Sequence, residues 1–145
     1  MADTILSGDC ELAWASGFFD GEGYVGIRLY QTRTGRTYHA LTVQIGQKVR
    51  APLDEFLRTV GHGKVVYKGA RRGFLYTTAS KQAAEVLGLL VPYLRVKREV
   101  AEIALRFQKT MNVHYQGSFG KGVPSKVVQA RQEFREQIMT MNQAN

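Results

Sequence analysis

The chain has 145 residues, 44% of them hydrophobic, which fits a single domain (residues 1–145) with one core. Its 20 Lys and Arg outnumber 12 Asp and Glu, and the formal net charge of +8 favours DNA or RNA as a partner, although a basic surface can serve solubility alone. The single cysteine, Cys10, excludes an internal disulfide and a cysteine-rich zinc site. No apolar run approaches the roughly 18 residues of a membrane span, so we expect an intracellular protein, in the cytosol or nucleoid or in an organelle.

The first predicted element is a helix over about residues 9–20, which Gly21 and Gly23 bring to an end. Apolar residues cover nearly all of its faces. Such a helix is buried on more than one side, and in so short a chain we expect the second side to lie against another subunit.

From Tyr24 the pattern changes to a period of two, which predicts two strands joined by a polar turn at 31–36. A helix from Pro52 to Gly61 follows, and then a weaker hairpin with strands at 64–68 and 74–78. Further helices are predicted from residue 80 to Pro92, over about 96–111 and, after a Gly-rich loop at 116–123, over about 124–143. This order predicts an α+β fold, αββαββα, with helices on one face of an antiparallel sheet. Its core spans about 9–111, and the last helix is a C-terminal extension.

The other face of the sheet is polar and basic, as in proteins that place a two-stranded ribbon in the major groove of DNA. A merely solvated sheet face is the alternative. Arg28 and Gln44 are the best candidates for reading bases, because Arg fits the acceptor edge of guanine and Gln the edge of adenine. We expect the turn arginines to contact phosphates. The DNA-contacting candidates are Arg28, Tyr30, Thr32, Arg33, Arg36, Tyr38, Thr42, Gln44, Lys48, Lys64, Lys68, Arg71, Arg72, Phe74 and Tyr76.

Small residues recur every four positions along the first helix, at Ala13, Gly17 and Gly21. A second backbone could approach this stripe closely. If two copies of the helix pack about a two-fold axis, their Glu22 carboxylates converge at the axis, where they could hold Mg²⁺ against the phosphates of DNA. We therefore expect a homodimer through the helix that spans residues 12–21. The predicted interface consists of Ala13, Trp14, Ser16, Gly17, Asp20 and Gly21.

The segment Ala15-Ser16-Gly17-Phe18-Phe19-Asp20-Gly21-Glu22-Gly23 resembles the motif of the LAGLIDADG homing endonucleases, in which a helix ends in a metal-binding acid. Ala15 and Ser16 replace the usual leucine and alanine. A single copy of the motif is similar to the homodimeric branch of the family. The likeness runs from about residue 12 to 107 and includes the segments 43–48 and 92–97. It implies the family's saddle-shaped sheet on DNA.

The resemblance also implies catalytic roles. Glu22 would be the metal ligand, with the Gly21 carbonyl as a further oxygen, whereas the alternative is a solvated glutamate at a helix end. Gln47 would position the attacking water, or else be an exposed strand-end amide. Lys97 matches a lysine that the family places near the scissile phosphate, although a plain surface lysine fits the spacing equally well. The family's basic residue after the glutamine falls here on Ala51. Arg50 is the substitute candidate, and Lys48 is an alternative. Asp20 is expected to be structural.

The implied activity is double-strand cleavage of a long, pseudo-palindromic DNA target, with short 3′ overhangs and Mg²⁺ as cofactor, a site that Mn²⁺ or Ca²⁺ could also occupy. Such an enzyme belongs to a mobile genetic element, as in introns. The alternatives are a non-cleaving binder of the same fold, either an intron RNA maturase or a repressor, and an unrelated basic protein associated with the ribosome. His39, His62 and His114 lack the spacing of metal ligands and are expected to be ordinary polar residues.

Overall fold

The computed structural model describes residues 2–112 and 123–144. The predicted loop at 116–123 and His114 therefore lie outside the described residues, apart from Val123. The elements are α1 (Ala2–Glu22), β1 (Gly23–Gln31), β2 (Thr37–Gln47), α2 (Ala51–Val60), β3 (Lys64–Tyr67), β4 (Phe74–Ala79), α3 (Ser80–Leu90), the 3-10 turn η1 (Val91–Tyr93), α4 (Arg98–Met111) and α5 (Ser125–Ala144). None of the described helices combines the length and the apolar character needed to cross a membrane.

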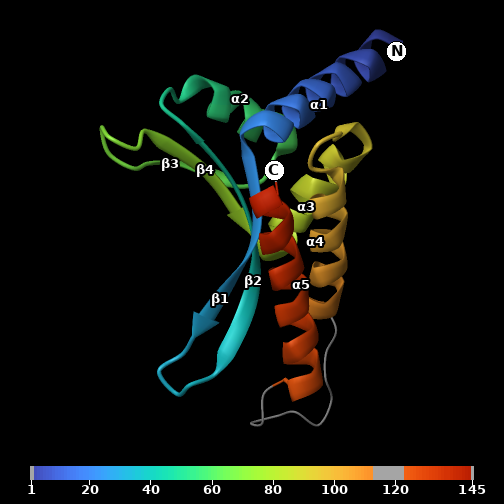
Figure 1. The fold of residues 1–145 in the computed structure, drawn as a ribbon. Coiled ribbons are helices and arrows are strands. Elements are labelled where there is room, and N and C mark those ends of the chain that lie inside the picture. Colours follow the sequence, from blue (N-terminus) through green and yellow to red (C-terminus); the bar gives the residue numbers. More distant parts are fainter. Residues whose placement is uncertain (1, 113–122, 145) are drawn as a thin grey trace.

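The four strands form one antiparallel sheet in the order β1-β2-β4-β3. Helices α3, α4 and α5 lie along one face of this sheet, and the two hairpins diverge from each other around the opposite, open face (Figure 1). The predicted α+β fold and its αββαββα order, followed by the two helices α4 (Arg98–Met111) and α5 (Ser125–Ala144), are confirmed. Among the described elements, these three helices thus leave the opposite face of the sheet uncovered (Figure 1).

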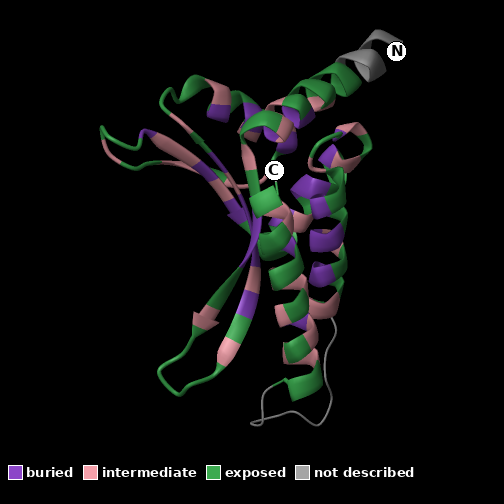
Figure 2. Cartoon of the chain, in the orientation of Figure 1, coloured by how far each residue is buried: buried purple, intermediate pink, exposed green. Residues whose placement is uncertain are grey.

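The core lies between the sheet and the helices (Figure 2). Val25 and Ile27 on β1 face the same side as Leu41, Val43 and Ile45 on β2, as the alternation predicts, because each residue points to the face opposite its neighbour. Above them, aromatic rings join α1 to α2 and β4. The Phe19 ring lies 6.2 Å from that of Phe56, and the Phe56 ring lies 4.9 Å from that of Tyr76. These packed rings fix the end of α1 over the sheet.

Helix α1 is longer than predicted at both ends. It begins at Ala2, not near residue 9, because Gly8 alone interrupts the helical sequence and a single interior glycine costs only about 1 kcal/mol. It ends at Glu22, and β1 starts at the next residue, Gly23. A Cβ at Gly23 would lie 2.3 Å from the buried Phe19 ring, so this junction requires glycine. Helix and strand are therefore joined without a loop, and Glu22 is held at a fixed corner.

Helix α5 covers the free edge of β1. The Arg135 Nε donates a hydrogen bond to the Ile27 carbonyl at 3.1 Å, and the Asn142 Nδ2 donates one to the Val25 carbonyl at 2.9 Å. An uncovered edge strand is a template for pairing with other chains. The role of the C-terminal helix could not be predicted from the sequence. The structure shows that it packs on the domain and supplies hydrogen-bond donors to two edge carbonyls of β1, the strand that follows Glu22.

Replacing both Arg135 and Asn142 by alanine should lower the free energy of unfolding by about 2 kcal/mol, because two partly buried carbonyls lose their donors. Urea denaturation would measure the change. The exposed Gln137 on the same helix provides the control, and Gln137→Ala should stay within about 0.5 kcal/mol of the unmodified protein. A double variant as stable as this control would argue against the edge-covering role.

Candidate active site and DNA interface

Glu22 is exposed at the last position of α1, beside the exposed Gly21. A carboxylate at this end of a helix opposes the helix dipole and is stabilised by a nearby cation. Its carboxylate and the Gly21 carbonyl are oxygen donors of the type that Mg²⁺ prefers. Among the described residues of one chain, no group of three or more His, Cys, Asp or Glu could hold a metal ion. Glu22 therefore offers donors of suitable chemistry, but the described residues of the chain provide no complete ligand set.

Asp20 and Lys97 lie against each other next to Glu22. Both oxygens of the Asp20 carboxylate accept backbone hydrogen bonds, from the amides of Arg95 and Lys97, each at 2.9 Å. The Lys97 Nζ donates in turn to the Asp20 carbonyl at 2.6 Å. The structure thus brings Lys97 to the last turn of α1. It also uses the Asp20 carboxylate inside the protomer, to fix the segment that precedes α4.

Gln47 is the last residue of β2. Since Gly23 pairs with Ile45, the antiparallel register places Gln47 at the end of the sheet where α1 passes into β1. The turn after β3 packs on it closely: Gly73 has a φ of 74°, and a Cβ there would lie 2.5 Å from the Gln47 carbonyl oxygen. The Lys48 ammonium donates to the Arg71 carbonyl of the same turn. These contacts tie the end of β2 to the second hairpin.

Arg50 is held on the surface beside this junction. Its Nε lies 3.2 Å from the Asp54 carboxylate, and its guanidinium lies 5.9 Å from the centre of the Phe74 ring. Both contacts leave the side chain more than half exposed, at 54%. The structure therefore places Arg50 with α2 and β4 rather than with the Asp20 and Lys97 pair.

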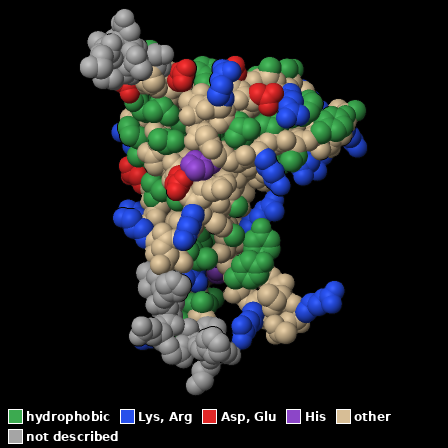
Figure 3. Space-filling model, turned by 180° about the vertical axis from the view of Figure 1, so that it is seen from behind, with side chains coloured by type: hydrophobic (Ala, Val, Ile, Leu, Met, Phe, Trp, Pro, Cys, Tyr) green, Lys and Arg blue, Asp and Glu red, His purple; other side chains and the backbone are tan. Residues whose placement is uncertain are grey.

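The open face of the first hairpin carries Arg28, Tyr30, Tyr38 and Gln44. The rings of Tyr30 and Tyr38, which are paired across the ladder, stack at 4.8 Å. Gln44 donates from Nε2 to the Thr77 hydroxyl on β4 at 3.4 Å. Lys and Arg side chains gather along this side of the molecule (Figure 3). The exposed basic residues of the turns and of β3 are Arg33, Arg36, Lys64, Lys68, Arg71 and Arg72.

Thr32 organises the tip of the first hairpin. Its amide donates to the Arg36 carbonyl at 2.8 Å, and its hydroxyl accepts a bond from the Arg36 amide at 3.1 Å. Gly35 completes the turn with a φ of 82°, a conformation that favours glycine. Arg33 and Arg36 are thus presented on an ordered turn at the end of the open face.

Two predicted DNA contacts on β4 were placed on the wrong face. Val65 pairs with Tyr76, and Tyr67 pairs with Phe74, so both aromatic residues point to the helix side, away from Lys64. Tyr76 is 0% exposed and donates to the His62 carbonyl at 2.6 Å, and burial raises the pKa of its hydroxyl. The open face of β4 carries Leu75 and Thr77 instead. The turn length sets which residues face together, and the alternation within each strand does not reveal it.

Thr42 lies on the open face as predicted, but only 4% of it is exposed. Its neighbours across the ladder are Gly26 and Ala79. The Tyr24 ring lies across Gly26, where a Cβ would be 2.3 Å from the Tyr24 hydroxyl. Tyr24, itself 49% exposed, thus covers the sheet beside Thr42 and takes its place on the surface that a partner would meet.

Along α1, the small-residue stripe is exposed: Ala13, Gly17 and Gly21 face outward, and a Cβ at either glycine would meet nothing within 4 Å. Trp14 is also exposed. Ser16, in contrast, was wrongly predicted to be at the interface, because it is 0% exposed and donates to the Leu90 carbonyl at 3.2 Å. Ser16, like its neighbour Ala15, is buried and points toward the end of α3, away from the exposed stripe.

The fold matches solved homing endonucleases. The homing endonuclease I-CvuI, in complex with the I-CreI target, superposes with a TM-score of 0.79 over 93% of this chain and 83% of its own, at 16% sequence identity. The archaeal intron-encoded homing endonuclease I-Vdi141I, complexed with DNA, superposes with a TM-score of 0.76 over 92% of this chain and 84% of its own, at 14% sequence identity. The LAGLIDADG homing endonuclease I-GzeII, in complex with its DNA target, superposes with a TM-score of 0.71 over 86% of this chain and 43% of its own, at 19% sequence identity.

This chain has the fold of the LAGLIDADG homing endonucleases. No sequence model of a protein family and no curated protein sequence matches it. The likeness therefore rests on three-dimensional structure and on the segment from Ala15 to Gly23, which occupies the end of α1.

Within this homing-endonuclease fold, the open-face residues that the strand alternation missed include Tyr24, Leu75 and Thr77. Tyr24 could have been found from the sequence, because it is the first residue after the helix to share a face with Arg28. Leu75 and Thr77 required the pairing register of β4 with β2. These three residues complete the surface that lies between the two hairpins.

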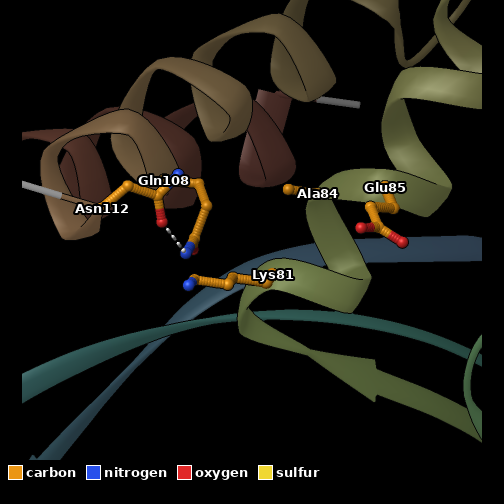
Figure 4. A pocket seen from close by; sticks show the side chains of 5 residues that line it. All are labelled: Lys81, Ala84, Glu85, Gln108 and Asn112. Carbon is orange, nitrogen blue, oxygen red and sulfur yellow. Dashed lines mark hydrogen bonds between the residues drawn. The ribbon is translucent and has the colours of Figure 1, made fainter.

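A separate hollow lies between α3 and α4 and is lined by Lys81, Ala84, Glu85, Gln108 and Asn112 (Figure 4). Gln108 donates from Nε2 to the Asn112 side chain at 3.3 Å, and its buried Oε1 has no hydrogen-bond partner among the described residues. His62 pairs with Glu85 of this hollow at 2.6 Å, and His39 pairs with Gln132 elsewhere on the helix side at 2.9 Å. This hollow lies on the helix side and not on the open face.

Proposed function

We propose that the protein is a sequence-specific DNA endonuclease that acts as a symmetric homodimer and cuts both strands of a long, pseudo-palindromic target. The observation that carries the proposal is the position of Glu22, at the corner where a helix with an exposed small-residue stripe passes directly into the first strand of a basic, open sheet. One chain thus places an acidic side chain at the edge of a surface suited to DNA.

The open face supports DNA as the partner. It combines Arg28 and Gln44, which suit base edges, with basic side chains on both hairpin turns, which suit phosphates. Two neighbouring structures, those of I-CvuI and I-Vdi141I, are complexes with DNA. A net charge of +8 adds a non-specific attraction that weakens with salt.

The small-residue stripe supports the homodimer. A two-fold axis along paired α1 helices would bring two Glu22 carboxylates together, whereas one chain offers no complete metal site among its described residues. The chain also spans only 43% of I-GzeII, so two copies correspond in size to about one such chain. A symmetric dimer reads a target with the same symmetry.

In this proposal, Glu22 and the Gly21 carbonyl would hold Mg²⁺, which Mn²⁺ or Ca²⁺ could replace. When bound, Mg²⁺ supplies stabilisation of the attacking and leaving oxygens in phosphodiester hydrolysis. Gln47, at the same end of the sheet, would orient the attacking water. Lys97, held at the Asp20 carbonyl, would place its charge beside the scissile phosphate, and Arg50 is a further cation near the junction.

The direct experiment uses DNA that joins the sequences flanking the reading frame of this chain, since a homing enzyme targets the uninterrupted junction. Gel-shift in Ca²⁺ should show a complex, and incubation in Mg²⁺ should give two fragments with short 3′ overhangs. Binding in both ions without fragments would instead support a non-cleaving binder of the same fold, a maturase or a repressor.

Arg28→Ala should lower discrimination at one base pair in each half-site by about 1–3 kcal/mol, because a bidentate arginine contact is lost. Competition gel-shifts against single-base variants of the target would measure the loss. Arg106 is another exposed arginine, on α4 and away from the open face, and Arg106→Ala should leave the preference unchanged. Equal preferences for Arg28→Ala and the unmodified protein would remove Arg28 from base readout.

A further inference from the structure

Trp14 is a large aromatic side chain on an otherwise small-residue surface. It is the single tryptophan of the chain and is 44% exposed. Its ring stacks on Phe18 at 5.4 Å and 9°, and Phe18 in turn contacts Phe56 of α2 at 6.2 Å. These contacts place Trp14 on the α2 side of the stripe formed by Ala13, Gly17 and Gly21. They also fix the ring, so that docking it would cost little side-chain entropy.

A pocket of about 380 Å³ lies on the other side of the same stripe. On α1 it is lined by Ala13, Gly17 and Asp20, and across from them by Pro92, Tyr93, Arg95 and Arg98. It is therefore at the level of Trp14 along the helix, because Trp14 follows Ala13 and precedes Gly17. Trp14, which forms a knob, and the pocket thus occupy opposite flanks of one exposed face of α1.

The wall of this pocket is fixed within the protomer. The Arg95 amide donates to the Asp20 carboxylate at 2.9 Å, and the Tyr93 hydroxyl donates to the Asp9 carboxylate at 2.6 Å, a bond that raises the pKa of the Tyr93 hydroxyl. Arg98 donates to the Val91 and Pro92 carbonyls, both at 3.2 Å. The pocket thus exists before any partner binds, with Arg95 and Arg98 among its lining residues.

We infer that the Trp14 of each protomer inserts into this pocket of a second copy of the chain. The inference rests on the proposed homodimer. A two-fold axis parallel to the paired α1 helices places equivalent residues of the two helices at the same height. It also sets opposite flanks of the two helices against each other, so the Trp14 flank of one helix faces the pocket flank of the other. An arginine in the pocket lining suits the face of an indole. The interface therefore contains two identical knob-and-pocket pairs around the axis that joins the Glu22 carboxylates.

Fluorescence of the single tryptophan provides the first test. As the protein is diluted through the dimer-to-monomer transition defined by sedimentation, the Trp14 emission should shift to longer wavelength, because the indole passes from the pocket into water. An emission that stays constant through that transition would overturn the inference while leaving the homodimer intact. A chain that sediments as a monomer at every concentration would overturn both.

Substitution provides the second test. Trp14→Ala should weaken dimerisation by at least about 100-fold, since a buried central tryptophan is a typical hot spot and the dimer loses two. Tyr67 is an exposed aromatic residue on β3, and Tyr67→Ala, the matched control, should leave dimerisation unchanged. Equal weakening by both variants, or by neither, would contradict the inference.

A mixing experiment separates docking from folding. Ala13→Phe should fill the pocket and block the homodimer. Mixed with Trp14→Ala, it should form a heterodimer at least about tenfold more stable than either variant homodimer, because one Trp14 meets an open pocket and the added Phe faces the space left by the other. If the mixture dimerises no better than the separate variants, although the unmodified protein dimerises, Trp14 does not dock there.

Discussion

Glu22→Gln is expected to slow DNA cleavage at least about 1,000-fold and to leave binding of the target within about threefold. The amide has the shape of the carboxylate but lacks the charge that holds a divalent cation. The side chain is exposed and makes no hydrogen bond recorded among the described residues, so the substitution should not disturb the fold. Single-turnover cleavage in Mg²⁺ and gel-shift in Ca²⁺ would measure the two effects separately.

The matched control is Glu102→Gln, which removes one exposed carboxylate from α4. It should cleave at the rate of the unmodified protein. If Glu22→Gln cleaves as fast as Glu102→Gln, the metal site lies elsewhere and Glu22 is not a metal ligand. If Glu22→Gln loses binding as well, the carboxylate serves assembly or folding.

Asp20→Ala is expected to lower the free energy of unfolding by about 2–4 kcal/mol, because the amides of Arg95 and Lys97 both lose a charged acceptor. Cleavage should fall as well, since the segment that carries Lys97 is no longer fixed to the end of α1. Chemical denaturation and single-turnover kinetics at low temperature would follow the two effects.

Asp54 provides a comparison, because its carboxylate pairs with Arg50 on the surface and is 51% exposed. Exposed pairs contribute about 0–1 kcal/mol, so Asp54→Ala should be far milder. Similar stability losses for the two variants would mean that the Asp20 bonds contribute little. A stability loss without any effect on cleavage would separate Asp20 from the positioning of Lys97.

The order of helices and strands could be predicted from the sequence because the hydrophobic period changes at Tyr24 and again near Pro52. The faces of the first hairpin followed as well, since Val25 and Leu41 begin clear alternations on both strands. The second hairpin was different. Its faces depend on the pairing of Val65 with Tyr76, and a turn of unknown geometry hides that register.

In the candidate site, too, local features could be predicted from the sequence and contacts between distant residues could not. The end of α1 could be located because glycines flank Glu22, but the bonds that join Asp20 to Lys97 link residues 77 positions apart and have no local signal. Ser16 was misplaced because the helix is apolar on most sides, so the sequence does not reveal which side faces the protomer. Trp14 was predicted to be at the interface, but the pocket on the other flank of the stripe has no local signal, because Pro92, Tyr93, Arg95 and Arg98 come from a distant part of the sequence.

The most direct measurement of the central claim is to map both cut ends on the junction DNA after incubation with the unmodified protein and Mg²⁺. Cuts related by a two-fold axis at the centre of the target, one in each strand and leaving short 3′ overhangs, are the predicted result, with no cuts by Glu22→Gln. A stable complex on that DNA that yields no cut in either strand would contradict the account.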